Sequence, residues 1–236
     1  MGCYLKNDGV RRLLNQYVLD ADEKPELCFI WMHGLGADAQ NMLALAKELP
    51  LRVPAKHIAI EAPVRPVTCN QSMPMRAWYD ITELSERNEE DEAGIRASAA
   101  FIHDVIDEEM KKGFRSDQII LAGFSQGGAM ALVAGLTASY PLAGIVSLSA
   151  YLPIVSQIKI HQERQVPIFM ALGLHDEVVL PSWTKKAVDW LKMQGFLHVS
   201  DYHYPMQHTV CFEEIMALSY WVSTKVRIKG DEKERS

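Results

Sequence analysis

The sequence predicts an α/β fold in which helices cover both faces of a mostly parallel sheet. Short apolar runs alternate with amphipathic stretches over most of the chain, as in repeated strand–helix units. Apolar residues make up 48% of the 236 residues and charged residues 23%, which excludes a disordered chain. Because no Pro-, Gly- or Ser-rich linker divides the chain, we predict a single domain over residues 1–236. An N-terminal arm covers about residues 1–26 and a charged tail about residues 229–236.

Three elements begin the alternation. Residues 27–32 are apolar throughout, which is typical of a parallel strand buried on both faces. Residues 41–49 carry apolar side chains at helical spacing and predict a helix. Residues 57–61 form a second short strand, which the following Ala-Pro pair ends.

The middle of the chain contains the longest predicted helix. Over residues 90–113 apolar side chains recur at steps of three and four, charged side chains take the other face, and Gly113 ends the helix. Residues 118–124 predict a buried strand, and residues 126–137 predict a helix of small residues.

The last third continues the same alternation. Residues 144–148, 168–172 and 198–204 predict strands, and residues 182–193 and 213–225 predict helices. Since these elements are connected by short segments, we expect no insertion large enough to form a helical lid.

Two segments, residues 63–91 and 151–165, show no clear periodicity. Each follows a strand, so both are expected over the carboxyl edge of the sheet, where open α/β folds bind ligands. We therefore expect these two segments to wall the functional site.

Composition excludes several function classes. The 24 basic and 30 acidic residues give a net charge of −6, which disfavours binding to nucleic acid. No apolar run is long enough to span a membrane, and no secretory signal is visible. The four scattered cysteines do not form a disulfide framework, so a reducing cytoplasm is the expected location. Metal-binding His/Cys clusters and nucleotide-binding glycine loops are absent, so neither a metal nor a cofactor is expected.

The strongest motif is Gly-Phe-Ser-Gln-Gly at residues 123–127, between a predicted strand and a predicted helix. That context is typical of a nucleophile elbow, a turn so sharp that glycines are needed on both sides. The turn exposes Ser125 at the start of a helix, where the helix dipole favours a developing oxyanion.

A nucleophilic serine needs a base, and the base needs an orienting carboxylate. Asp176 and His208 each follow a predicted strand, in the chain order that the elbow motif predicts. Glu177 is the alternative to Asp176, and His175 is the weaker alternative to His208.

An oxyanion hole requires two backbone N–H groups. One is expected from Gln126, the residue after the nucleophile, and the other from the loop after an early strand. That loop begins with His33-Gly34 directly after the first predicted strand, so the Leu35 N–H is our candidate. We interpret His33 as a structural residue that fixes the loop.

The chain resembles the acyl-protein thioesterase, lysophospholipase and carboxylesterase family of small α/β-hydrolases. The resemblance rests on His-Gly-Leu-Gly-Ala-Asp at 33–38, Ala-Pro at 62–63 through Pro-Val-Thr at 66–68, Met-Arg-Ala-Trp-Tyr-Asp-Ile at 75–81, Gly-Phe-Ser-Gln-Gly-Gly at 123–128 and Asp-Glu-Val-Val at 176–179. It implies an α/β-hydrolase fold with no large lid and no cofactor. It also implies a triad of Ser125, Asp176 and His208, with Leu35 and Gln126 at the oxyanion hole.

The resemblance further implies a shallow apolar groove for an acyl chain. Met73, Trp78 and Trp183 lie in or near strand-end loops and are our candidates for contacting substrate. Many family members carry Gly-His at the base, whereas this chain has Gln207-His208, which removes backbone freedom if a positive φ is needed there.

We therefore interpret the chain as a serine hydrolase that cleaves carboxylic esters, and also acyl thioesters, through an acyl-enzyme. A lipidated protein or a lysophospholipid is the alternative main substrate, and homodimer formation is left open. Lactone hydrolysis is a further alternative, although related lactone hydrolases carry cysteine at the elbow. A non-catalytic binding module would be expected to lack a triad residue, and none is missing.

Overall fold

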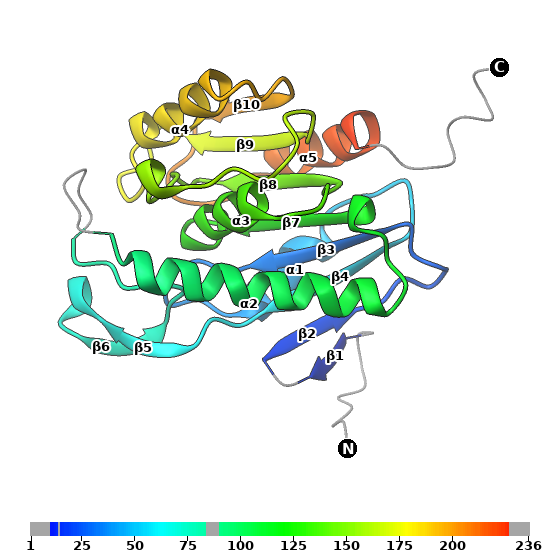
Figure 1. Ribbon diagram of the computed structural model, residues 1–236, viewed down its shortest axis with the longest axis horizontal. Helices are drawn as coiled ribbons and strands as arrows, with labels where there is room; N and C mark the ends of the chain where they lie inside the picture. Colours follow the sequence, from blue (N-terminus) through cyan, green and yellow to red (C-terminus); the bar gives the residue numbers. More distant parts are fainter. Residues whose placement is uncertain (1–9, 14, 84–89, 227–236) are drawn as a thin grey trace.

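The structure is a computed structural model that describes residues 10–13, 15–83 and 90–226. The charged tail predicted over residues 229–236, and the beginning of the predicted arm, lie outside these ranges. Within the described residues, the largest sheet has eight strands in the order β1-β2-β4-β3-β7-β8-β9-β10 (Figure 1). The strands are β1 (Val10–Leu13), β2 (Gln16–Leu19), β3 (Leu27–Met32), β4 (Ala55–Ile60), β7 (Ile119–Phe124), β8 (Gly144–Leu148), β9 (Ile168–Gly173) and β10 (Val199–Tyr204).

The sheet is parallel from β4 to β10 and antiparallel only at the edge formed by β1 and β2. This confirms the predicted mostly parallel sheet. The inner strands β3, β7, β8 and β9 are buried almost throughout, because helices cover both of their faces.

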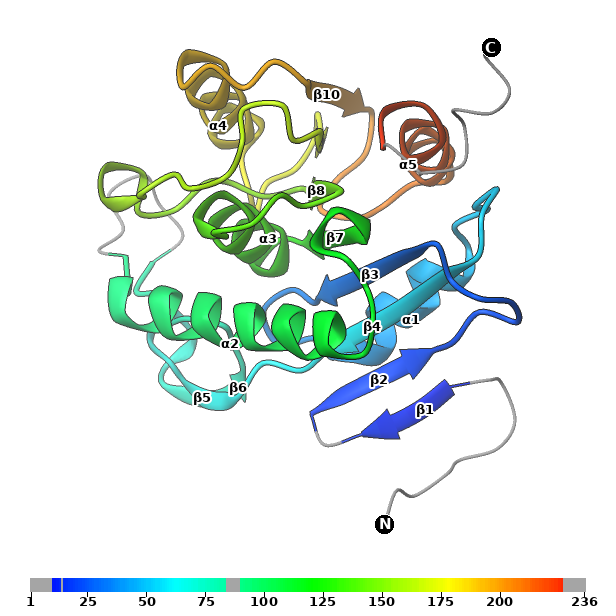
Figure 2. The same cartoon turned by 45° about the vertical axis from the view of Figure 1, so that its right-hand side comes forward.

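The helices divide between the two faces of the sheet. One core contains buried residues of α2 (Glu92–Lys111), α3 (Gln126–Thr137) and α4 (Pro181–Met193). The other core contains buried residues of α1 (Ala39–Lys47) and α5 (Phe212–Lys225). Figure 2 shows α2 in front of the sheet and α1 behind it. All five helices were predicted, and α3 has the predicted bounds.

The long helix α2 illustrates why the sequence folds in this way. Its apolar stripe is buried against the sheet, as the three- and four-residue spacing predicted. Asp91 caps the helix by accepting a hydrogen bond from the Gly94 N–H at 2.8 Å. The helix ends at Lys111 with Lys112 as its C-cap, and Gly113 follows with a φ of +110°.

The predicted N-terminal arm, about residues 1–26, contains two strands that the sequence analysis did not predict. β1 and β2 form an antiparallel hairpin, and β2 extends the sheet by pairing with β4. Tyr17 and Val18 of β2 are buried. Four-residue strands place only two side chains on each face, which is too few to reveal a period of two.

The segment after β4, predicted without regular structure, contains a second small sheet. β5 (Val64–Val67) and β6 (Met73–Arg76) pair antiparallel around the short 3₁₀ helix η1 (Thr68–Asn70). Pro66 faces Pro74 in this hairpin, and such residues are typical of edge strands. Further 3₁₀ turns are η2 (Ser116–Gln118) and η3 (Val155–Gln157).

Candidate active site

Ser125 lies on a sharp turn between β7 and α3. Its φ of +55° is rare for a residue with a side chain, and its N–H donates to the Leu148 carbonyl at 2.8 Å. Glycine is required at position 123, because a Cβ there would lie 2.2 Å from the Gly127 carbonyl oxygen. The turn has the strained strand–turn–helix geometry of a nucleophile elbow.

A continuous chain of hydrogen bonds joins the three residues predicted as a triad. The His208 Nε2 lies 2.9 Å from the Ser125 Oγ, and the His208 Nδ1 lies 2.7 Å from an oxygen of Asp176. Both distances are within the range for strong hydrogen bonds. The structure therefore brings together three side chains that are far apart in the sequence.

Asp176 is held in one orientation. Its second carboxylate oxygen accepts hydrogen bonds from the backbone N–H groups of Val178 and Val179, both at 2.9 Å. Its side chain is only 1% exposed. The two alternatives considered from the sequence, His175 and Glu177, are both exposed. Burial and contacts thus favour Asp176 and His208 over these neighbours.

The loop carrying His208 packs against the loop carrying Asp176. The His175 N–H donates to the Met206 carbonyl at 3.0 Å, and the His208 ring lies 4.7 Å from that of Phe124. Gln207 does not have a positive φ. Replacing the family's glycine at that position therefore requires no strained backbone.

The two residues predicted to supply the oxyanion-binding N–H groups lie at the same cavity. Leu35 and Gln126 both line the cavity beside Ser125, and neither N–H donates to another residue that the structure describes. Gln126 is the first residue of α3, so its N–H lies at the positive end of that helix. This arrangement could bind an oxyanion.

His33, at the start of the loop that contains Leu35, is fully buried. Its Nε2 accepts a hydrogen bond from the Ala62 N–H at 3.1 Å, and its Nδ1 lies 2.7 Å from the Gly34 carbonyl. These contacts require a neutral ring protonated at Nδ1. Burial lowers the pKa of His33, which also favours the neutral ring. The predicted structural role of His33 agrees with these contacts.

Ser125 opens into a cavity of about 600 Å³, a size typical of small-molecule sites. The two segments predicted to wall the site both contribute. Helix α4 supplies a third wall, of which the sequence analysis named only Trp183. Besides Ser125, Leu35 and Gln126, the cavity is lined by Tyr79, Ile81, Glu83, Glu90, Tyr151, Leu152, Val155, Val178, Val179, Trp183, Lys186, Ala187, Asp189, Trp190 and Met193.

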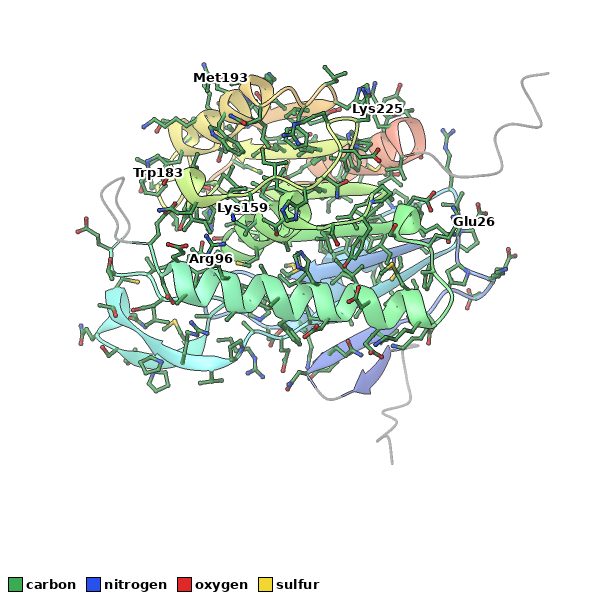
Figure 3. The ribbon with its side chains drawn as sticks, in the orientation of Figure 1. Glu26, Arg96, Lys159, Trp183, Met193 and Lys225 are labelled. Carbon is green, nitrogen blue, oxygen red and sulfur yellow. The ribbon has the colours of Figure 1, made fainter. Side chains whose placement is uncertain are left out.

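Three residues were predicted to contact substrate, and one of them, Trp183, lines the cavity. It lies at the start of α4 (Figure 3). The predictions for Met73 and Trp78 are corrected by the structure. Met73 is 55% exposed on the β6 strand and is not part of the lining. Trp78 is fully buried, and its indole N–H donates to the His33 carbonyl at 2.8 Å.

Tyr79 and Tyr151 were missed by sequence reasoning. Their hydroxyls lie 3.1 Å apart in the cavity wall. Burial raises the pKa of Tyr151 to about 12, so this phenol stays protonated and able to donate a hydrogen bond. The available signal was their position in the two strand-end segments, which does not by itself distinguish lining residues from core residues.

Neither a metal site nor a membrane span is found in the described part of the chain. No three or more His, Cys, Asp or Glu side chains there are grouped so that they could hold a metal ion. No described helix combines the length and the apolar character needed to cross a membrane.

Comparisons with known proteins agree with this geometry. Residues 14–226 match the family model described as Phospholipase/Carboxylesterase. Acyl-protein thioesterase 1 of Neurospora crassa is 37% identical over 220 residues, which cover 87% of this chain and 89% of the relative. The Mycosarcoma maydis acyl-protein thioesterase 1 is 34% identical over 215 residues, covering 83% and 90%.

Solved structures have the same fold. Acyl-protein thioesterase 2 of Zea mays matches with a TM-score of 0.80 and 28% identity, covering 89% of this chain and 98% of that one. Arabidopsis thaliana SOBER1 matches with a TM-score of 0.78 and 26% identity, covering 84% and 98%.

Proposed function

The chain belongs to the phospholipase/carboxylesterase family of hydrolases, and from this premise we propose that it cleaves carboxylic esters and acyl thioesters through an acyl-enzyme on Ser125. The observation that carries the proposal is the hydrogen-bonded chain from Asp176 through His208 to Ser125. It supplies a nucleophile, a base and an orienting group within contact distance of one another.

In the acylation step, the Ser125 Oγ attacks the acyl carbon while the His208 Nε2 takes its proton. Asp176 stabilises the imidazolium that forms and keeps the ring oriented through Nδ1. The oxyanion of the tetrahedral intermediate is bound by the N–H groups of Leu35 and Gln126. His208 then gives the proton to the leaving alcohol or thiol.

In the deacylation step, water attacks the acyl-enzyme with His208 again acting as the base. The same N–H groups bind the second oxyanion. The bond between the acyl carbon and the Ser125 Oγ then breaks, His208 returns the proton to this oxygen, and the carboxylic acid leaves. No cofactor is needed, because each step uses only side chains and peptide groups of this site.

The cavity supports an acyl chain as the bound group. Most of its lining is apolar, with Val155, Val178, Trp183 and Met193 among the contributors. Burial of each CH₂ contributes roughly 0.8 kcal/mol, so affinity should grow with chain length until the cavity is filled. That thioesters are among the substrates is supported by relatives named acyl-protein thioesterase at up to 37% identity.

The proposal is tested with a fluorophosphonate probe and matched substrates. The wild-type protein should be labelled and should hydrolyse p-nitrophenyl esters, whereas the Ser125→Ala variant should do neither. Oxygen esters and thioesters with the same acyl chain then separate the two activities, and a lysophospholipid in the same panel tests a lipid substrate. Unchanged hydrolysis by a folded Ser125→Ala variant would refute the mechanism.

A further inference from the structure

Residues 76–79, here called the brace segment, contact the loop that carries the first proposed oxyanion donor. The Gly36 N–H donates to the Arg76 carbonyl at 2.8 Å, and the Trp78 indole N–H donates to the His33 carbonyl at 2.8 Å. These contacts flank the peptide groups between positions 33 and 36, which include the N–H of residue 35. The brace segment therefore holds this loop at two points.

The same segment is bound by the residue that carries the second proposed donor. The side-chain oxygen of Gln126 accepts from the Trp78 backbone N–H at 2.8 Å, and its side-chain nitrogen donates to the Tyr79 carbonyl at 2.9 Å. Gln126 is only 3% exposed. Gln126 thus lines the cavity beside Ser125, and its side chain binds the brace segment.

Trp78 is the link between these two sets of contacts. It is fully buried, and its carbonyl accepts a hydrogen bond from the Ser98 hydroxyl. Its backbone N–H, carbonyl and indole N–H are therefore all paired, and losing any one partner would leave a buried polar group unsatisfied. The orientation of Trp78 is consequently well defined, and its contacts connect the loop at residues 33–36 with the first residue of α3.

We propose that Trp78 and the side chain of Gln126 are positioning residues that set the separation of the Leu35 and Gln126 N–H groups. This inference rests on the proposed function, since it concerns the oxyanion hole of that reaction. Trp78 does not line the cavity, so it acts through the peptide groups that it holds. Oxyanion binding is sensitive to such placement, because a displacement of about 1 Å can cost about 10²-fold in rate.

The test compares two identical substitutions at buried tryptophans. Trp78→Phe removes an indole N–H that donates to His33. Trp221→Phe is the matched control: Trp221 is 1% exposed in the opposite core, and its indole N–H has no hydrogen-bond partner among the described residues. Both variants lose similar side-chain volume, so both are expected to lose some stability.

The assays separate turnover from folding. For each variant, kcat and KM on a soluble p-nitrophenyl ester are normalised to the titrated active sites, and the inhibition constant of an alkyl boronic acid is measured. The boronic acid forms a tetrahedral anionic adduct with the serine, so its affinity reports the oxyanion hole. We expect Trp78→Phe to lower kcat by about 10- to 100-fold and to weaken the inhibitor in parallel, with KM changed less than about threefold. Trp221→Phe should change none of these.

Equal kcat and equal inhibitor affinity in the two tryptophan variants would overturn the positioning role, provided that Ser125→Ala is inactive. Activity retained in Ser125→Ala would instead refute the proposed function, and the brace with it. If Trp78→Phe does not fold, Gln126→Met deletes both side-chain contacts to the brace segment while keeping the side-chain length. It is expected to lower kcat and inhibitor affinity in the same parallel way, and normal values of both would overturn the inference.

Discussion

Glu214, the third residue of α5, should make the stability of the protein depend on pH. Glu214 is fully buried, and neither of its carboxyl oxygens has a hydrogen-bond partner among the described residues. Burial raises the pKa of Glu214 from 4.5 to about 8. Glu214 therefore stays protonated in the folded protein at neutral pH.

The direction in which stability changes with pH follows from the number of protons that the folded and unfolded states bind. Between pH 4.5 and about 8 the folded protein keeps a proton that the unfolded chain has released. The stabilisation contributed by the protonated Glu214 side chain is therefore complete below pH 4.5. It decreases as the pH rises above 4.5 and is lost once the pH exceeds about 8. A pKa change of this size corresponds to at most ~5 kcal/mol, at about 1.4 kcal/mol for each pH unit. Glu214→Gln keeps the size of the protonated acid but cannot ionise, so it should remove the decline.

Urea unfolding at pH 5, 7 and 8.5 measures this directly. The free energy of unfolding of Glu214→Gln, relative to that of the wild type, should increase by several kcal/mol from pH 5 to pH 8.5. Glu213→Gln, an exposed neighbour on the same helical turn, is the matched control and should show no such trend. A difference between Glu214→Gln and wild type that stays constant across this range would refute the burial argument.

Three further predictions concern the site. Ser125→Ala should lower kcat by on the order of 10⁶, as in the subtilisin series, with an unchanged melting temperature by circular dichroism; a folded and active variant would contradict it. Asp176→Asn should lower kcat by about 10⁴, as for the corresponding change in trypsin, because an amide no longer fixes the His208 tautomer; near-normal kcat in steady-state assays would exclude this orienting role. Gly173→Ala should lower kcat by about 10²-fold with a smaller effect on KM. The reason is that the added Cβ would lie 2.5 Å from the Gln207 carbonyl oxygen and would displace the loop that carries His208. Unchanged kinetics would show that the loop adapts to the added methyl group.

The elements that the sequence predicted best are those whose local pattern is repeated several times. The predicted helix over residues 90–113 has apolar side chains at helical spacing from Ile95 to Ile106, about three turns, and the structure has α2 at Glu92–Lys111. α3 has its predicted bounds because the elbow motif fixes its first residue. In both cases local periodicity and tertiary burial agree.

What the sequence could not predict depends on contacts between distant residues. From the sequence, Trp78 was predicted to contact substrate. An aromatic side chain in a segment after a strand can either line a cavity or pack in the protein core, and the sequence does not distinguish the two. The burial of Trp78 follows from pairing with His33 and Gln126, far away in the chain. Likewise, α4 residues such as Trp190 wall the cavity because α4 packs beside the site, and their helical spacing alone does not indicate this.

The proposed triad, in contrast, could be predicted from the sequence, because residues that directly follow parallel strands lie at the same edge of the sheet. β9 and β10 run parallel with Gly173 opposite Tyr204, so the loops after them begin at the same level of the sheet. The pairing continues past the strands, as the Leu174 N–H donates to the Tyr204 carbonyl at 2.8 Å. Asp176 and His208 follow these strand ends by only a few residues, so they must meet. An acid and a base that each closely follow one of two adjacent parallel strands are therefore neighbours before any side-chain contact is known.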